Sequence, residues 1–221
     1  MHERNGLLLI GEGFLILSEG VSIMYRTETK LAQIGNRSDR VTGAVNPPVY
    51  FSTAYHHEGI GQSTGFDYSR TGNPTRQLLE EAIADLEGGD RGFACSSGMA
   101  AIFTVLSLFQ AGDEWIVSDD LYGGTYRLLE QGYKKWGLCC KYVNTCNPEN
   151  IEKEITSKTK AIFLETPTNP LMQQTDIGAV AEIAKRHGIL LIVDNTFYTP
   201  LLQRPIKEGA DIVVHSATKY L

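Results

Sequence analysis

The sequence predicts an α/β domain built on a mostly parallel sheet. Two observations predict it. Beyond residue 92, short continuous runs of Ile, Val and Leu alternate with segments whose apolar residues recur at helical spacing. Such runs are typical of strands buried on both faces of a parallel sheet. Polar clusters follow most of these runs directly, and ligands of open parallel sheets bind at the carboxyl ends of the strands.

Composition excludes several other classes of protein. The 221 residues are 42% hydrophobic and 21% charged, which excludes a disordered chain. A net charge of -6 argues against a nucleic-acid coat or a binder of anionic membranes. The four cysteines form no Cys-x-x-Cys pair, so we predict no metal site and no disulfide scaffold, and we expect a cytoplasmic protein.

The first third of the chain lacks the alternating pattern. Its two N-terminal apolar runs are short and interrupted by glycines, and no basic leader or cleavage site accompanies them. We therefore expect residues 1–24 to be a disordered or non-native extension, with Met24 as the true start. Residues 25–75 are rich in Gly, Pro, Asn, Ser and Thr, which predicts an extended N-terminal arm with loops.

Residues 76–221 supply the elements of the predicted domain. The first helix carries apolar residues on one face, and Gly88-Gly89 ends it. The predicted helices are residues 75–86, 99–109, 125–136, a helix beginning near Pro148, and 177–187. The predicted strands are residues 92–95, 115–117, 138–143, 161–164, 189–193 and 212–214.

Candidate ligand-binding or catalytic residues follow three of the predicted strands. Residues 96–99 open a helix with small residues, which suits a phosphate as well as an ordinary serine cap. Asp194 ends an apolar strand, where it is either a carboxylate that needs a partner or a turn-forming residue. Lys219 follows Ser216 and Thr218. A lysine beside a desolvated pocket can form a Schiff base, whereas most lysines are solvated.

Two further candidates lie in glycine-rich segments. The Tyr122 ring either faces a planar ligand or is an ordinary core or surface tyrosine. Arg70, two residues after Tyr68, is either a bidentate phosphate ligand or a solvated arginine. No P-loop motif is present, and the glycines at 59–65 miss the dinucleotide motif by one position. We expect His215 to be a packed histidine.

A planar phosphorylated cofactor that is held by a lysine near a carboxylate describes pyridoxal phosphate. At the same residues the chain resembles the pyridoxal-phosphate enzymes of cysteine and methionine metabolism. The resemblance runs from about Lys30 to the last residue and rests on six ordered motifs. They are Tyr68-Ser-Arg-Thr-Gly-Asn-Pro-Thr75, Ser96-Ser-Gly-Met-Ala-Ala101, Asp120-Leu-Tyr-Gly-Gly-Thr125, Glu165-Thr-Pro-Thr-Asn-Pro170, Val193-Asp-Asn-Thr196 and His215-Ser-Ala-Thr-Lys219.

The resemblance implies a fold-type-I large domain over residues 76–221, without the family's C-terminal domain and its carboxylate-binding arginine. It implies that Lys219 holds the cofactor as a Schiff base and moves protons, while Asp194 keeps the pyridine nitrogen protonated. Tyr122 would stack on the ring and assist proton transfer, which makes Lys219, Tyr122 and Asp194 the implied catalytic residues. The cofactor-binding residues that it implies are Tyr68, Arg70, Ser97, Gly98, Met99, Tyr122, Asn169, Asp194, Ser216, Thr218 and Lys219.

Tyr68 and Arg70 are implied to reach the phosphate of a neighbouring subunit, which makes the protein a homo-oligomer, a tetramer by family habit. Its substrates would be small amino acids. The stretch from Thr29 to Tyr68 resembles bacterial cystathionine γ-synthases that also use sulfide on O-acetylhomoserine, so we expect γ-replacement on an O-acylhomoserine. Gly124 stands where methionine γ-lyases tend to carry cysteine, which disfavours that activity. A cystathionine β- or γ-lyase and an inactive fragment remain the alternatives.

Overall fold

The computed structural model of the chain describes residues 8–10, 14–16, 25–33, 39 and 41–221. Met24 and the other residues of the predicted extension, apart from 8–10 and 14–16, lie outside these residues. Within that extension, β1 (Leu8–Ile10) and β2 (Phe14–Ile16) pair as an antiparallel hairpin, which the sequence did not lead us to expect. No helix in the described part of the chain is long and apolar enough to cross a membrane.

A five-stranded parallel sheet with the order β4-β3-β5-β6-β7 forms the centre of the fold. Its strands are β3 (Glu114–Ser118), β4 (Cys139–Val143), β5 (Thr159–Glu165), β6 (Leu190–Asp194) and β7 (Ile212–Val214). The predicted α/β class is therefore confirmed. The chain runs outward from β3 to β4 and then returns to the other side of β3 with β5. Strand order thus reverses between β3 and β5, where a crevice opens in such sheets.

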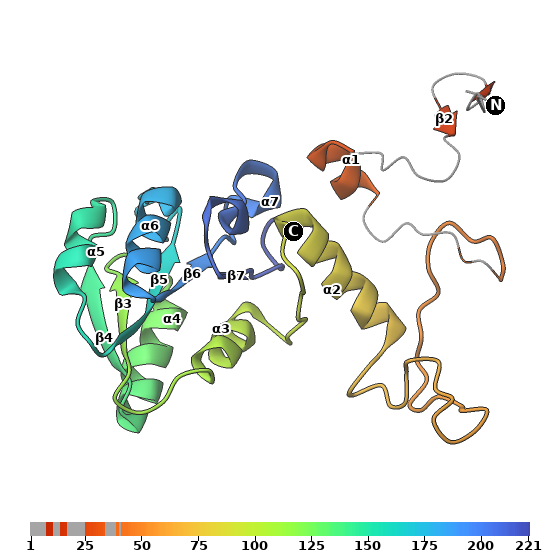
Figure 1. The fold of residues 1–221 in the computed structure, drawn as a ribbon, viewed down its shortest axis with the longest axis horizontal. Coiled ribbons are helices and arrows are strands. Elements are labelled where there is room, and N and C mark those ends of the chain that lie inside the picture. The colour runs from red at the N-terminus through yellow and green to blue at the C-terminus, as the bar shows by residue number, and fades with distance from the viewer. Residues whose placement is uncertain (1–7, 11–13, 17–24, 34–38, 40) are drawn as a thin grey trace, which may run out of the picture.

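Helices cover both faces of this sheet (Figure 1). The α-helices are α1 (Thr27–Ala32), α2 (Pro74–Glu87), α3 (Gly98–Leu106), α4 (Gly123–Arg127), α5 (Pro148–Glu154), α6 (Ile177–His187) and α7 (Thr199–Leu202). Three short helices accompany them: the π-helix η1 (Leu128–Gly132) and the 3-10 helices η2 (Tyr133–Trp136) and η3 (Pro205–Glu208). Side chains of Asn73, Ser97, Asn147 and Asp176 cap α2, α3, α5 and α6 by accepting backbone N–H groups.

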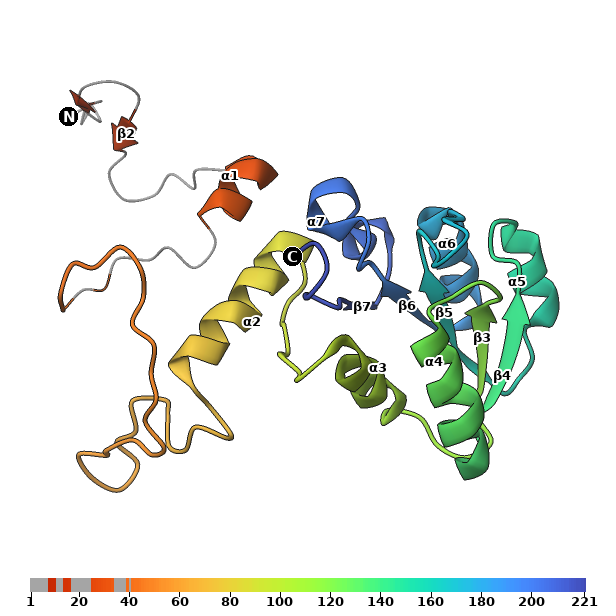
Figure 2. The ribbon, with the colours of Figure 1, turned by 180° about the vertical axis from the view of Figure 1, so that it is seen from behind.

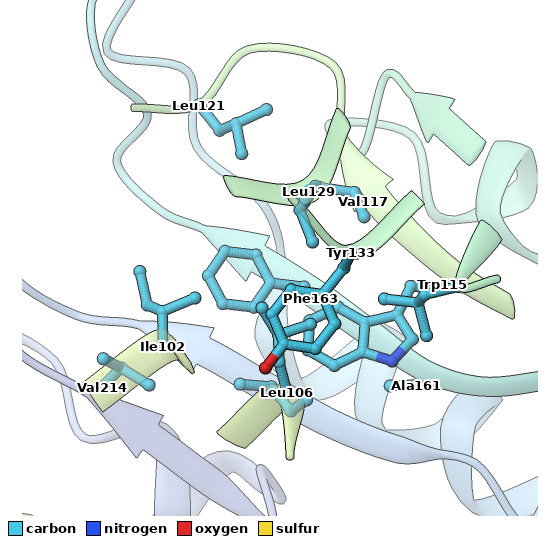
Figure 3. Packing of buried hydrophobic residues seen from close by; sticks show 12 residues of the cluster. Ile102, Leu106, Trp115, Val117, Leu121, Leu129, Tyr133, Ala161, Phe163 and Val214 are labelled. Atoms are coloured by element: carbon cyan, nitrogen blue, oxygen red, sulfur yellow. The ribbon is translucent and has the colours of Figure 1, made fainter. Parts of the chain in front are cut away.

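The core has two layers because successive strand residues point to opposite faces of the sheet. In β3, Trp115 and Val117 pack toward α3, η1 and η2, while Ile116 packs toward α5 and α6. Figure 3 shows the first layer, where the Trp115 and Phe163 rings stack with centroids 5.9 Å apart. Packed side chains therefore cover both faces of the sheet from which the loops at its carboxyl edge start.

The predicted strand at residues 92–95 is wrong. This segment forms no regular element and pairs with no strand among the described residues, and β7 pairs with β6 alone there. It packs on α2 instead. The Ala94 N–H donates to Glu80 Oε1 at 2.9 Å, and a Cβ atom on Gly92 would lie 2.3 Å from the Glu80 carbonyl oxygen. A side-chain acceptor on α2 therefore replaces a sheet hydrogen bond.

Two predicted helices have different limits in the structure. The helix expected at 99–109 ends at Leu106. The helix expected at 125–136 consists of α4, η1 and η2 in succession, and the last boundary falls at Gly132, which leaves helical geometry with φ -96° and ψ -81°. Figures 1 and 2 show α2 and the arm extending away from the sheet. The arm contains a helix, α1, whose Lys30 Nζ lies 2.7 Å from Asp85 on α2.

Candidate active site

A cavity of about 480 Å³ lies at the carboxyl edge of the sheet. Its lining comes from loops after four strands and from the start of α3. The lining residues are Ser97, Gly98, Met99, Ile102, Tyr122, Glu165, Pro167, Asn169, Asp194, Thr196, Phe197, Ser216, Thr218 and Lys219. The structure thus brings together every predicted site residue except Tyr68 and Arg70. Its position beside the reversal of strand order matches the ordinary ligand crevice of such sheets.

Asp194 is a buried carboxyl group at the end of β6. Its Oδ1 accepts the Thr196 backbone N–H at 3.0 Å and the Thr196 hydroxyl at 2.5 Å. Burial raises the pKa of Asp194, although hydrogen bonds from Thr196 and the nearby His215 act in the opposite direction. A buried carboxyl of this kind is best satisfied by a cationic or proton-bearing partner inside the cavity.

The start of α3 forms a cradle for an anion. Ser97 caps the helix by accepting the Ala100 N–H at 3.1 Å. Opposite it, the hydroxyl oxygens of Ser216 and Thr218 lie 3.4 Å apart, and the Ser216 N–H donates to Thr196 Oγ1 at 2.8 Å. Backbone N–H groups at a helix N-terminus, the helix dipole and two hydroxyls together suit a phosphate group.

Gly98 is required for the close approach of α3 to Ser216. A Cβ atom on Gly98 would lie 2.7 Å from the Ser216 Cβ and 3.0 Å from its Cα. We expect Gly98→Ala to lower the free energy of unfolding by about 1–3 kcal/mol through overpacking, measured by urea denaturation. Gly89→Ala is the matched control because a Cβ atom there meets nothing within 4 Å, so its effect should stay within about 0.5 kcal/mol. Equal stability of the two variants would contradict the overpacking.

Tyr122 lies between the end of β3 and α4, and its side chain is 46% exposed at the cavity. Its backbone N–H donates to Glu165 Oε2 at 2.7 Å. The ring lies directly over Gly124, where a Cβ atom would come within 2.3 Å of the ring carbon Cε1. Gly124 therefore leaves room for the observed position of the ring.

Sequence reasoning gave Glu165 no role, although it falls in one of the motifs. It ends β5, is 6% exposed and lies beside Asp194 in the parallel register of β5 and β6. Burial raises the pKa of Glu165 to about 8. The negative charges of Asp194 and Asp120 add to this, while N–H groups of Tyr122 and Asn169 oppose it. The signal that was available is its position, since Asp194 was selected as a strand-end carboxylate on the same ground.

The raised pKa of Glu165 predicts how stability depends on pH. Between pH 4.5 and about 8 the folded state keeps this carboxyl protonated, whereas the unfolded state ionises it. The folded state binds more protons, so the free energy of unfolding should fall as pH rises through this window, by up to about 1.4 kcal/mol per pH unit. Asp194 contributes with the same sign.

Urea unfolding between pH 5 and pH 8, without added ligands, measures this dependence. Glu165→Gln should be less pH-dependent than the wild type because glutamine does not titrate. The difference between the two proteins cancels the contribution of the histidines. An identical slope in both proteins would show that Glu165 binds no extra proton in the folded state.

His215 is packed in the interior, as predicted. Its Nε2 lies 2.5 Å from Oε1 of Glu87, the last residue of α2, and both side chains are buried. The same oxygen accepts Asn195 Nδ2–H at 2.9 Å. This contact ties α2 to the loops after β6 and β7, next to Asp194. Sequence reasoning missed Glu87 because a glutamate on an amphipathic helix is usually solvated.

Tyr68 and Arg70 lie in the arm, outside the cavity. They line a separate groove of about 220 Å³, together with Tyr50, Phe51, Ser52, Thr53, Ser69 and Asn73. An Arg70 guanidinium N–H donates to the Tyr68 hydroxyl, and the guanidinium carbon lies 5.1 Å from the ring centroid. These two residues thus form a local cation–π pair. Their assignment to the site of a neighbouring subunit stays a prediction.

Comparison with known proteins decides the family. The family model described as "Cys/Met metabolism PLP-dependent enzyme" matches residues 28–221, where PLP is pyridoxal phosphate. The chain belongs to this family. The enzymes of this family depend on pyridoxal phosphate as their cofactor.

Relatives of this Cys/Met metabolism family member include both synthases and lyases. The chain is 67% identical over 194 residues to a Bacillus subtilis cystathionine gamma-synthase/O-acetylhomoserine (thiol)-lyase, covering 88% of this chain and 52% of the relative. It is 52% identical over 198 residues to a Lactococcus lactis cystathionine beta-lyase, covering 90% and 52%. The chain spans about half the length of the curated relatives it matches.

Solved structures give the same picture for this family member. A Xanthomonas oryzae cystathionine gamma synthase, in complex with aminoacrylate and cysteine, matches with a TM-score of 0.85 and 41% identity, covering 90% of this chain and 51% of that one. A Lactobacillus plantarum cystathionine gamma-lyase complexed with L-serine matches with a TM-score of 0.85 and 49% identity, covering 89% and 51%. The predicted fold-type-I large domain is therefore confirmed.

Proposed function

We propose that the cavity binds pyridoxal phosphate and that the protein uses it for γ-replacement. The reaction would join an O-acylhomoserine to cysteine or sulfide, giving cystathionine or homocysteine. One observation carries the cofactor assignment: a single cavity holds the Lys219 amine, the buried Asp194 carboxyl and the anion cradle at the start of α3. An aldehyde, a ring nitrogen and a phosphate are the groups that these three would bind.

The phosphate would be held by the N–H groups of Gly98 and Met99, the cap residue Ser97 and the hydroxyls of Ser216 and Thr218. Gly98 supports this placement because a side chain there would fill the cradle. The carboxyl of Asp194 would hold a proton at the ring nitrogen, which satisfies a group that burial alone destabilises.

Three residues would act on the ring and the substrate. Lys219 would bind the cofactor aldehyde and afterwards move a proton at the substrate Cα and Cβ. Tyr122 would orient the ring by stacking, and Asn169 would contact the cofactor or substrate from the loop after β5. When bound, pyridoxal phosphate supplies an electron sink for the charge that develops at the amino-acid Cα.

Tyr68 and Arg70 would serve the phosphate of a second copy. Their separation from the cavity of their own chain supports this role, and so does the positive charge of Arg70 in their groove. The protein would then be a homo-oligomer with shared sites, a tetramer by the family habit. Sedimentation of the cofactor-loaded protein tests the oligomeric state.

Replacement is favoured over elimination by the degree of similarity. Identity is 67% to the Bacillus synthase and thiol-lyase but 52% to the Lactococcus beta-lyase. A cystathionine lyase is the second candidate because lyases also match at about half identity, and the cofactor-side groups serve elimination equally well. A non-catalytic, cofactor-binding piece is the third, since the chain spans about half of its relatives.

Product analysis distinguishes these candidates. Purified protein with pyridoxal phosphate is incubated with O-acetylhomoserine or O-succinylhomoserine, with cysteine or sulfide, and separately with cystathionine. We expect cystathionine or homocysteine from the acylhomoserines. Cleavage of cystathionine without any replacement product would establish the lyase instead. A protein that holds the cofactor but converts none of these compounds would be the non-catalytic piece.

A further inference from the structure

Two loops meet where the strand order reverses, and polar contacts join them. One follows β3 (residues 119–122), and the other follows β5 (residues 166–170). The Asp120 carboxylate accepts the Thr168 hydroxyl and the Leu171 N–H, the latter at 3.0 Å. On the cavity side Glu165 Oε2 accepts the Tyr122 N–H at 2.7 Å, and the Asn169 N–H acts on the same carboxyl by lowering its pKa.

The Glu165 carboxyl has a different task from the Asp194 carboxyl beside it. Glu165 already accepts the backbone N–H of Tyr122, so this carboxyl is engaged by the wall of the cavity. The hydrogen bonds to Asp194 in the described part of the chain come from Thr196, on one oxygen. Asp194 therefore retains acceptor capacity toward the cavity, while Glu165 is committed to the protein.

Burial and charge explain why a carboxyl can occupy this place. Two ionised carboxylates side by side on neighbouring strands would repel each other. Burial and the charges of Asp194 and Asp120 raise the pKa of Glu165 to about 8, so its carboxyl is mostly neutral at neutral pH. A neutral carboxyl still accepts N–H groups through its oxygens. Glutamine has nearly the same shape, and its amide oxygen can accept the Tyr122 N–H.

We infer that Glu165 is a positioning residue: its hydrogen bond fixes the backbone of Tyr122 at the cavity and so sets where the planar cofactor binds. The effect on the cofactor rests on the proposed function, whereas the positioning of Tyr122 rests on the observed hydrogen bond alone. Glu165 does not act on the substrate. Glu165 acts through Tyr122: its carboxyl accepts the Tyr122 backbone N–H, and this hydrogen bond fixes the position from which the Tyr122 ring reaches the cavity.

Amide hydrogen exchange of the protein without pyridoxal phosphate tests the positioning directly. In Glu165→Ala the Tyr122 amide should exchange roughly 10-fold faster or more, because it loses its acceptor. Glu165→Gln should keep the Tyr122 amide protected. Glu165→Asp, whose carboxyl is one methylene shorter, should lose protection although it keeps the acid. Glu182→Ala, at an exposed position on α6, is the matched control.

Cofactor binding tests the consequence. The Kd for pyridoxal phosphate should rise roughly 10-fold or more in Glu165→Ala and Glu165→Asp, with a changed circular dichroism band of the bound ring. Glu165→Gln should restore both readouts. Unchanged exchange in the folded alanine or aspartate variant would overturn the inference, and so would a glutamine variant as impaired as alanine. If alanine fails to fold, the aspartate and glutamine pair decides.

The two proposals fail in different ways. A wild-type chain that binds no pyridoxal phosphate would overturn the proposed function, while the exchange experiment would still decide whether Glu165 fixes the backbone of Tyr122. A wild-type chain that binds the cofactor, with exchange and affinity indifferent to Glu165, would overturn the inference alone.

Discussion

Lys219→Ala is expected to abolish covalent retention of pyridoxal phosphate. Wild-type protein loaded with the cofactor should show a visible absorbance band that borohydride removes, because the Lys219 amine in the cavity is proposed to form a Schiff base. The variant should show no such band after desalting. Any turnover by the loaded protein should fall roughly 10²–10⁴-fold, the range for a lost proton-transfer group.

The matched control is Lys185→Ala, an exposed lysine on α6. It should keep the band and its sensitivity to borohydride. Mass spectrometry of the reduced protein should place the added mass on Lys219. A reduced adduct on another lysine, or an unchanged band in Lys219→Ala, would remove Lys219 from the site.

Asp194→Asn is expected to weaken binding of pyridoxal phosphate by roughly 10²–10³-fold. The proposed contact pairs a buried carboxylate with a protonated ring nitrogen, and removing one partner of a buried charge pair costs about 3–5 kcal/mol. Asparagine keeps the shape and the contact to Thr196 but not the charge. Fluorescence titration with pyridoxal phosphate measures the change.

Asp90→Asn is the control for this variant, because Asp90 is exposed in the turn after α2. Its affinity should equal that of the wild type. Asp194→Asn should also retain the phosphate cradle, so its affinity for inorganic phosphate should be unchanged. Equal cofactor affinity of Asp194→Asn and wild type would show that the ring nitrogen lies elsewhere.

Much of the fold and the cavity was predictable because both depend on short-range pattern. Continuous apolar runs such as residues 161–164 predicted buried parallel strands, and the polar residues after them predicted what gathers at one edge. The geometry of a parallel sheet then brings Asp194, Ser216 and Lys219 together, because the carboxyl ends of all its strands lie at one edge. Periodicity therefore located the site, and the resemblance named its ligand.

The parts that were not predictable depend on tertiary contacts. Residues 92–95 have the composition of a strand, but the Glu80 carboxylate on α2 takes the Ala94 N–H. In the sequence Glu165 is an ordinary polar residue at a strand end. Only the strand register places it beside Asp194, and only the folded loop brings the Tyr122 N–H to its carboxyl. Likewise, the helical spacing of residues 125–136 does not disclose the π-helical hydrogen bonds of η1.

The unpaired side of β7 has a consequence for handling the protein. This short strand of Ile212, Val213 and Val214 offers backbone donors and acceptors along one side, because β6 is its only partner in the described part of the chain. Apolar strands that end a sheet in this way can template edge-to-edge association and aggregation. Dilute solutions and moderate temperature therefore favour the monodisperse samples that the binding measurements need.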